Sequence, residues 1–161
     1  MADFEVKITD NSQMILREFE HLTEAALEAV GLAATAHAVE GCPVGTTEST
    51  HIKNYHGGGL RKSLTHKVIG NDVYVGTNYS VTHDGRRIAV GPFVEYGTGI
   101  YAADGNGRKS PWVWIDKNGK GHYTHGMKPR HFLRNALSNP SHIREYKHIL
   151  QAVYTGKNTK F

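Results

Sequence analysis

The sequence predicts an α+β domain in which a long N-terminal helix packs on an antiparallel sheet of hairpins, with short helices at the C-terminal end. Three observations predict this class. Residues 12–39 repeat apolar side chains at helical spacing, β-branched segments gather between residues 60 and 124, and a helical pattern opened by a proline follows residue 139. Because strands and helices do not alternate, a βαβ nucleotide-binding fold is not expected. The length of 161 residues and the lack of repeats indicate one domain over residues 1–161.

The N-terminal region combines a short strand or arm with the long helix. Residues 4–8 alternate apolar and charged side chains, as a half-buried strand does. The helix over residues 12–39 has an apolar side chain at every third or fourth position. These are Ile15, Phe19, Leu22, Ala26, Ala29 or Val30, Ala33 and Ala36. N-cap candidates occupy residues 10–12, and Gly41 and Pro43 end the helix. Small side chains fill its second half, which predicts close approach of a sheet or of a second copy.

The first half of the central region is predicted to hold two strands between loops. Residues 44–59 have little apolar content and predict a flexible loop. Residues 60–69 and 73–77 predict antiparallel strands, because Gly70-Asn71-Asp72 between them is a hairpin turn signal. Residues 78–87 are predicted to be loop.

The second half of the central region is predicted to hold another hairpin. Residues 88–96 are an apolar stretch, interpreted as a strand that carries Glu95, and residues 97–110 are rich in glycine. Residues 112–115 and 122–124 predict paired strands, since Asn118-Gly119 between them is the strongest turn signal of the chain.

Two helices are predicted at the C-terminal end. The first begins at Pro129 and runs to Leu137. Asn139 followed by Pro140 predicts an N-cap and first position for a second helix that runs to about Tyr154. Residues 155–161 are expected to be a mobile tail.

Composition and charge exclude several classes of protein. Nineteen Lys and Arg against fifteen Asp and Glu give a net charge of +4, with no block of five like charges, which supports solubility more than a nucleic-acid arm. No apolar run approaches the roughly 20 residues of a membrane span, and the N-terminus has no secretory signal pattern. A soluble protein made in the cytoplasm, without membrane or specific nucleic-acid binding, is therefore expected.

Nucleophile and cofactor motifs are absent from the sequence. The single cysteine, Cys42, excludes an intramolecular disulfide and CxxC motifs, and its place beside Pro43 suits a small buried residue. No GxSxG elbow occurs, and the glycine runs at residues 97–99 and 105–107 are too short to cradle a phosphate. Neither catalytic residues nor cofactor is predicted.

Histidine is abundant, with 11 residues, and histidine is the commonest metal ligand, so a metal site is the main alternative. The chain has no HxxxH or HExxH pair. Two pairs of histidines lie near each other in the sequence, His122 with His125 and His142 with His148, but neither pair has the spacing of metal ligands. The nearby carboxylates, Asp104, Asp116 and Glu145, do not have that spacing either. Solvated or hydrogen-bonded histidines are therefore favoured and no metal site is predicted, while a small histidine-rich metal-dependent hydrolase or nuclease stays the alternative function.

Surface features of the central region favour contact with proteins. Its basic residues are Arg61, Lys62, Lys67, Arg86, Arg87, Arg108 and Lys109. Tyr74 and Tyr79 lie among them, which would suit a weak DNA-facing surface, but solvated strand faces are the favoured interpretation. Trp112 and Trp114 beside a predicted hairpin, together with many glycine loops, suit a protein that docks with other proteins.

Five segments, taken in order, resemble a known family. They are Cys42-Pro43-Val44, Gly59-Leu60-Arg61-Lys62-Ser63-Leu64, Val73-Tyr74-Val75-Gly76-Thr77, Phe93-Val94-Glu95-Tyr96-Gly97-Thr98-Gly99, and Gly126-Met127-Lys128-Pro129-Arg130-His131-Phe132-Leu133 with Ala136. In this order the chain resembles the tail-completion or head–tail joining proteins of long-tailed bacteriophages, the HK-ninety-seven-type tail-component family. The similarity covers roughly residues 12 to 155.

The resemblance implies a non-enzymatic virion protein at the neck or upper tail that helps join the tail to the DNA-filled head. The partners it implies are the tail terminator, the tail tube and the connector, with the chain as a homo-oligomer on a ring of sixfold symmetry. The motif residues it implies for fold and assembly are Cys42, Pro43, Gly59, Leu60, Arg61, Ser63, Glu95, Gly97, Thr98, Gly99, Gly126, Pro129 and Phe132.

Physical roles can be expected for several of these residues. Gly59 would permit a left-handed turn before a strand, and Arg61 would pair with Glu95 if their strands are neighbours. Gly97 and Gly99 would turn the backbone after the strand of Glu95.

Proline and loop positions add three further expectations. Pro43 would set the exit of the long helix, and Pro129 would begin the helix that packs Phe132 and Leu133 under the sheet. The family runs through Asp-Thr-Gly directly into Leu-Arg, whereas here about fifteen residues, within the loop 44–59, intervene. We expect this enlarged loop to order only against a neighbouring subunit.

Overall fold

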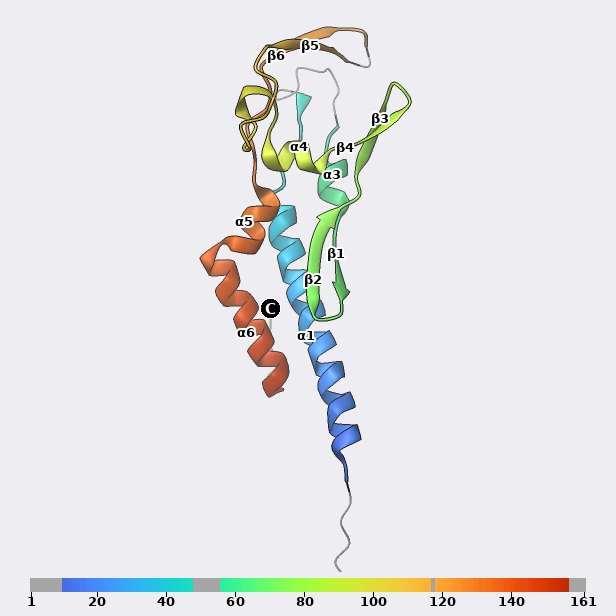
Figure 1. Cartoon of the computed structure of the whole chain (residues 1–161), viewed down its shortest axis with the longest axis vertical. Helices are drawn as coiled ribbons and strands as arrows, with labels where there is room; N and C mark the ends of the chain where they lie inside the picture. Colours follow the sequence, from blue (N-terminus) through green and yellow to red (C-terminus); the bar gives the residue numbers. More distant parts are fainter. Residues whose placement is uncertain (1–9, 48–55, 117, 157–161) are drawn as a thin grey trace, which may run out of the picture.

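The computed structural model describes residues 10–47, 56–116 and 118–156. It confirms the α+β class: a long N-terminal helix, three small antiparallel hairpins and short C-terminal helices. The elements spread along the long helix instead of wrapping around one centre (Figure 1). The predicted strand at residues 4–8 lies outside the described residues, as do residues 48–55 of the loop predicted at 44–59 and residues 157–161 of the predicted tail.

Helix α1 (Ser12–Gly41) is the axis of the molecule. Helix α6 (Pro140–Thr155) packs along one side of it and the first hairpin along the other (Figure 1). Its buried positions are all small, at Ala26, Gly31, Ala34 and Ala38. A Cβ at Gly31 would lie 2.3 Å from the His66 ring, so the missing side chain is what lets the hairpin approach. The predicted approach of a sheet to the small-residue half of this helix is confirmed.

The strands form three separate two-stranded sheets. Strands β1 (Leu64–Ile69) and β2 (Asp72–Thr77) pair from Leu64 opposite Thr77 to Ile69 opposite Asp72, as the turn signal predicts. Strands β5 (Trp112–Ile115) and β6 (Gly121–Thr124) form the other predicted hairpin.

Three predictions for the central region are wrong. Residues from Gly59 to Lys62 form a short helix, α3, before β1 begins. Residues 78–87, predicted as loop, contribute to a hairpin of β3 (Ser80–His83) and β4 (Arg86–Ala89), whose turn contains Asp84 and Gly85 at positive φ. The stretch that carries Glu95 is helix α4 (Gly91–Tyr96), because Pro92 in its first turn favours a helix start.

The C-terminal helices agree with prediction except at one start. Helix α6 (Pro140–Thr155) begins where Asn139 accepts a hydrogen bond from the Ser141 N–H, as expected. Helix α5 (Phe132–Ser138) begins three residues after Pro129, because His131 has a φ of 50° and interrupts the helical backbone. A 3-10 turn, η1 (Gly99–Tyr101), lies in the glycine-rich segment.

The buried core lies where the C-terminal end of α1 meets α3, β1 and α5. It consists of Ala38, Cys42, Leu60, Leu64, Phe132 and Ala136. Phe132 was expected to pack under the sheet; it packs instead against this end of α1, since α5 contacts α1 directly. Across the described ranges, only four buried apolar residues are larger than cysteine, namely Leu60, Leu64, Phe132 and Ile149.

Many large apolar side chains remain exposed. Twenty-one of them are exposed on the described part of the chain, against the four that are buried. Thirteen of them gather in two regions, the first turns of α1 and the end of the molecule that carries α4 and the β5–β6 hairpin. Among residues 10–47, 56–116 and 118–156, no helix is long and apolar enough to cross a membrane.

Candidate assembly site

Two of the motif segments meet at one junction beside the end of α1. The segments around residues 94–100 and 125–131 lie side by side and bond through their backbones. The Thr98 N–H donates to the Met127 carbonyl at 2.8 Å, and the Arg130 N–H donates to the Val94 carbonyl at 2.9 Å. The Thr98 hydroxyl also accepts the Met127 N–H at 2.9 Å. We call this pairing the motif junction.

Glycine is required at the motif junction because the two backbones touch. A Cβ at Gly99 would lie 2.0 Å from the His125 carbonyl oxygen, and one at Gly126 would lie 2.1 Å from that of Thr98. Gly97 and Gly99 also have φ values of 76° and 63°, which only glycine adopts without strain. The turn expected at these two glycines is present, although it follows a helix instead of a strand.

Glu95 binds the start of α5, which corrects the predicted pairing with Arg61. Its carboxylate is 3% exposed and accepts the N–H groups of Leu133 and Arg134, each at 2.9 Å. These are the second and third residues of α5, whose own N-cap residue, His131, provides no side-chain acceptor. A carboxylate from α4, a neighbouring helix of the same chain, therefore takes the place of the N-cap side chain that α5 lacks.

Arg61 binds the end of α1 instead of Glu95. Its guanidinium donates to the Cys42 carbonyl, from Nε at 2.9 Å and from Nη2. The two residues do not pair because they lie on the short helices α3 and α4, not on neighbouring strands. Burial raises the pKa of the Cys42 thiol, and the nearby Arg61 charge partly opposes that shift. The prediction of Cys42 as a small buried residue is confirmed, since it is 0% exposed.

The remaining motif positions make structural contacts outside the motif junction. The left-handed turn expected at Gly59 is at Gly58, with a φ of 105°; at Gly59 a Cβ would lie 2.5 Å from the Tyr79 ring. Ser63 donates to the Leu60 carbonyl at 2.8 Å, and its hydroxyl lies 2.5 Å from that of Thr77. Pro43 follows the residue at which α1 is capped, as expected.

Each of several histidines pairs with one carboxylate. His37 contacts Glu145 at 2.8 Å and His66 contacts Glu28 at 2.9 Å. His37 also stacks on the ring of His142, with centroids 3.6 Å apart. Within the described ranges no group of three or more His, Cys, Asp or Glu is placed to hold a metal ion. These pairs join elements far apart in the sequence, so residue spacing could not predict them.

Asp116 and His122 form a pair that organises the β5–β6 hairpin. Asp116 accepts the N–H groups of Asn118 and Lys120 at 2.8 and 3.0 Å, and its other oxygen contacts His122 Nε2 at 2.9 Å. The hydrogen bond with His122, followed by the Lys120 amide, lowers the pKa of the Asp116 carboxyl. The ring of Trp114 stacks on His122 with centroids 4.4 Å apart. The arrangement stabilises a turn.

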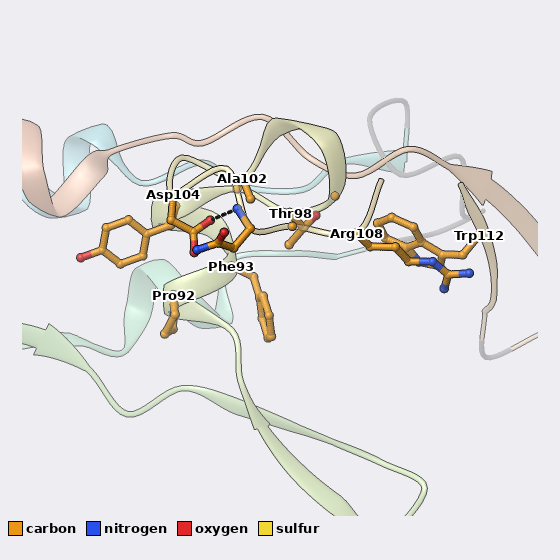
Figure 2. Close-up of a pocket in the computed structure, with 12 residues that line it drawn as sticks. Pro92, Phe93, Thr98, Ala102, Asp104, Arg108 and Trp112 are labelled. Atoms are coloured by element: carbon orange, nitrogen blue, oxygen red, sulfur yellow. Dashed lines mark hydrogen bonds between the residues drawn. The ribbon is translucent and has the colours of Figure 1, made fainter. Parts of the chain in front are cut away.

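An open groove of about 690 Å³ lies beside the motif junction, and we call it the aromatic groove (Figure 2). It is lined by Pro92, Phe93, Tyr96, Gly97, Thr98, Gly99, Ala102, Asp104, Asn106, Gly107, Arg108 and Trp112. Phe93 and Tyr96 are 48% and 58% exposed, and the Arg108 guanidinium lies 5.5 Å from the centre of the Trp112 ring. The sequence indicated Trp112 as a contact residue, whereas Phe93 and Tyr96 were interpreted as part of a strand.

A second exposed apolar surface lies at the opposite end of the molecule. The first turns of α1, Ser12–Phe19, carry Met14, Ile15, Leu16 and Phe19, which are 59 to 63% exposed. We call these turns the α1 tip. They extend past the end of α6 and past the β1–β2 turn (Figure 1).

Comparison of the chain with protein-family models, with curated proteins and with solved structures found no significant match.

Proposed function

We propose that this chain is a non-enzymatic structural protein of a long-tailed bacteriophage virion. It acts at the neck or upper tail, where it helps join the completed tail to the head as part of a ring-associated homo-oligomer. Its partners are other virion proteins of the neck and tail: tail terminator, tail tube and connector. It is made in the host cytoplasm and located in the particle.

The observation that carries this proposal is the uncovered apolar surface at both ends of an elongated chain. Contiguous exposed apolar patches on a protein are typical of interfaces with other macromolecules. The α1 tip and the aromatic groove are two such patches, and the described residues bury only four apolar side chains larger than cysteine. A chain with so small a core gains stability when neighbouring subunits cover its surface.

The resemblance to tail-completion proteins supports the same proposal. The motif segments that carry it, at residues 93–99 and 126–133, pair through their backbones, and Glu95 ties them to α5. These contacts give the motif residues structural roles, which suits a protein that acts by binding to other proteins.

Deletion of the gene tests the proposal. In the phage whose genome encodes this chain, loss of the protein should leave DNA-filled heads and separate tails in electron micrographs. Heads and tails would each assemble without the protein, and only the connection between them would be missing. Addition of the purified protein to such a lysate should restore joined, infectious particles. Joined particles in the absence of the protein would overturn the proposal.

The alternative, a metal-dependent hydrolase, has its own test. Metal analysis and nuclease and protease assays of the wild type and the His122→Ala and His125→Ala variants should detect neither bound metal nor activity. Stoichiometric metal, with activity lost in the variants, would favour the hydrolase.

A further inference from the structure

The α1 tip has an apolar surface that no described element covers fully. Its stripe continues the one that is buried further along α1, where Ala26 is 0% exposed. The ring of Tyr154 stacks on Phe19, with centroids 5.8 Å apart. Within the described ranges no other aromatic ring stacks on this stripe. One turn earlier, Ile15 is 62% exposed. The stripe that packs inside the molecule therefore runs on beyond it.

The aromatic groove offers a matching concave surface at the other end. Its lining includes the Phe93, Tyr96 and Trp112 side chains together with Gly97, Gly99 and Gly107. A Cβ at Gly107 would lie 2.1 Å from the Gly99 carbonyl, so the backbone there is packed too closely for a side chain at residue 107. An apolar groove of this kind suits the apolar stripe of an amphipathic helix.

Charge makes the two ends complementary. Residues 10–24, which include the α1 tip, carry one arginine and four acidic residues, a net charge of −3. Residues 80–130, which include the groove, carry eight basic and four acidic residues, a net charge of +4. Attraction between the two surfaces favours their meeting, whereas tip-to-tip pairing would bring Glu18 and Glu20 against their own copies.

We propose that the α1 tip of one copy of this chain docks in the aromatic groove of the next copy. The two surfaces lie at opposite ends of the long axis, so they meet only between molecules (Figure 1). Such a contact is heterologous: each copy offers one tip and one groove, and copies join head to tail until the rotation closes a ring. This inference rests on the proposed assembly function and specifies the surface that joins neighbouring copies.

Disulfide trapping between variants that each carry one introduced cysteine tests which surfaces meet, even when the affinity is weak. Ile15→Cys protein is mixed with mass-tagged Phe93→Cys protein under mild oxidation, and the products are separated by mass. The native Cys42 is fully buried and does not compete. We expect the mixed disulfide to dominate. The matched control, Leu32→Cys mixed with Phe93→Cys, places the thiol on the same helix at a position 66% exposed, and should give several-fold less product.

Two outcomes of trapping would overturn the docking proposal. One is a dominant Ile15→Cys homodimer, which would mean that tips pair with tips. The other is equal trapping by the Leu32→Cys control, which would mean that collisions are unspecific.

Complementation separates failure of this inference from failure of the proposed function. Ile15→Asp protein should not restore joining of heads and tails in a lysate that lacks the chain, whereas Leu32→Asp should restore it as the wild type does. If the wild type restores joining and Ile15→Asp does so equally well, the docking is wrong and the assembly function stands. If the wild type itself restores nothing, the assembly function is wrong, whatever the trapping result.

Discussion

Replacement of Glu95 by alanine should destabilise the protein by a large part of its folding free energy. The buried carboxylate accepts the Leu133 and Arg134 N–H groups at 2.9 Å each. A hydrogen bond to a charged group contributes about 1.5 to 3 kcal/mol, so two of them amount to about 3 to 6 kcal/mol. Domains of this size have about 5 to 15 kcal/mol in total, so Glu95→Ala is expected to be close to unfolding.

Urea unfolding followed by circular dichroism measures this effect. Glu95→Gln keeps one acceptor oxygen but turns an NH₂ group toward the other N–H, so it should lose about 1.5 to 3 kcal/mol. The matched control is Glu40→Ala, an exposed carboxylate on α1, which should change stability by no more than about 0.5 kcal/mol. The amides of Leu133 and Arg134 should exchange faster in Glu95→Ala.

Two results would refute the reasoning about Glu95. A loss below about 1 kcal/mol in Glu95→Ala, at an unchanged denaturant slope, would mean that the two amides find other acceptors. Equal losses in the Gln and Ala variants would mean that the carboxylate charge, and not the number of acceptors, carries the contribution.

Three other perturbations test neighbouring features. Arg61→Ala should lower the free energy of unfolding in urea by about 1.5 to 3 kcal/mol, because the Cys42 carbonyl loses its charged donor. An unchanged free energy of unfolding would contradict a stabilising role for this hydrogen bond. Gly99→Ala should prevent folding or shift the motif junction, since its Cβ would lie 2.0 Å from the His125 carbonyl; native-like circular dichroism and melting would contradict this. The lowered pKa of Asp116 means that its stabilisation of the hairpin is present above the ordinary carboxyl pKa and is lost as pH falls through the lowered value. Tryptophan fluorescence should report that loss in acid, and Asp116→Asn should remove this pH dependence.

Local chemistry explains which elements the sequence could predict. The apolar spacing of residues 12–39 and the cap at Asn139 act within a few residues along the chain, and both helices are present. The turn signal at residues 70–72 likewise sets the register of β1 and β2. These features depend on backbone preferences that neighbouring residues decide.

The errors fall where distant segments decide the local structure. The Glu95 segment has strand-like composition, but it folds as α4, and its carboxylate is held by the start of α5, 38 residues away. The β3–β4 hairpin is an exception, because its turn, Asp84-Gly85, is itself a local hairpin signal that the loop prediction for residues 78–87 overlooked. The pairing expected between Arg61 and Glu95 failed because it assumed two adjacent strands.

The long helix, two of the hairpins and the final capped helix follow from the amino-acid sequence alone, because hydrogen bonds and steric limits between near neighbours select them. Which charges meet and which apolar surfaces stay open depends on how distant segments pack together. Glu95 reaches α5, and Phe93 lines a groove, because the motif junction brings residues 94–100 against 125–131. Contacts between residues so far apart in the sequence depend on how the whole chain folds, so the spacing of residues along the chain does not predict them.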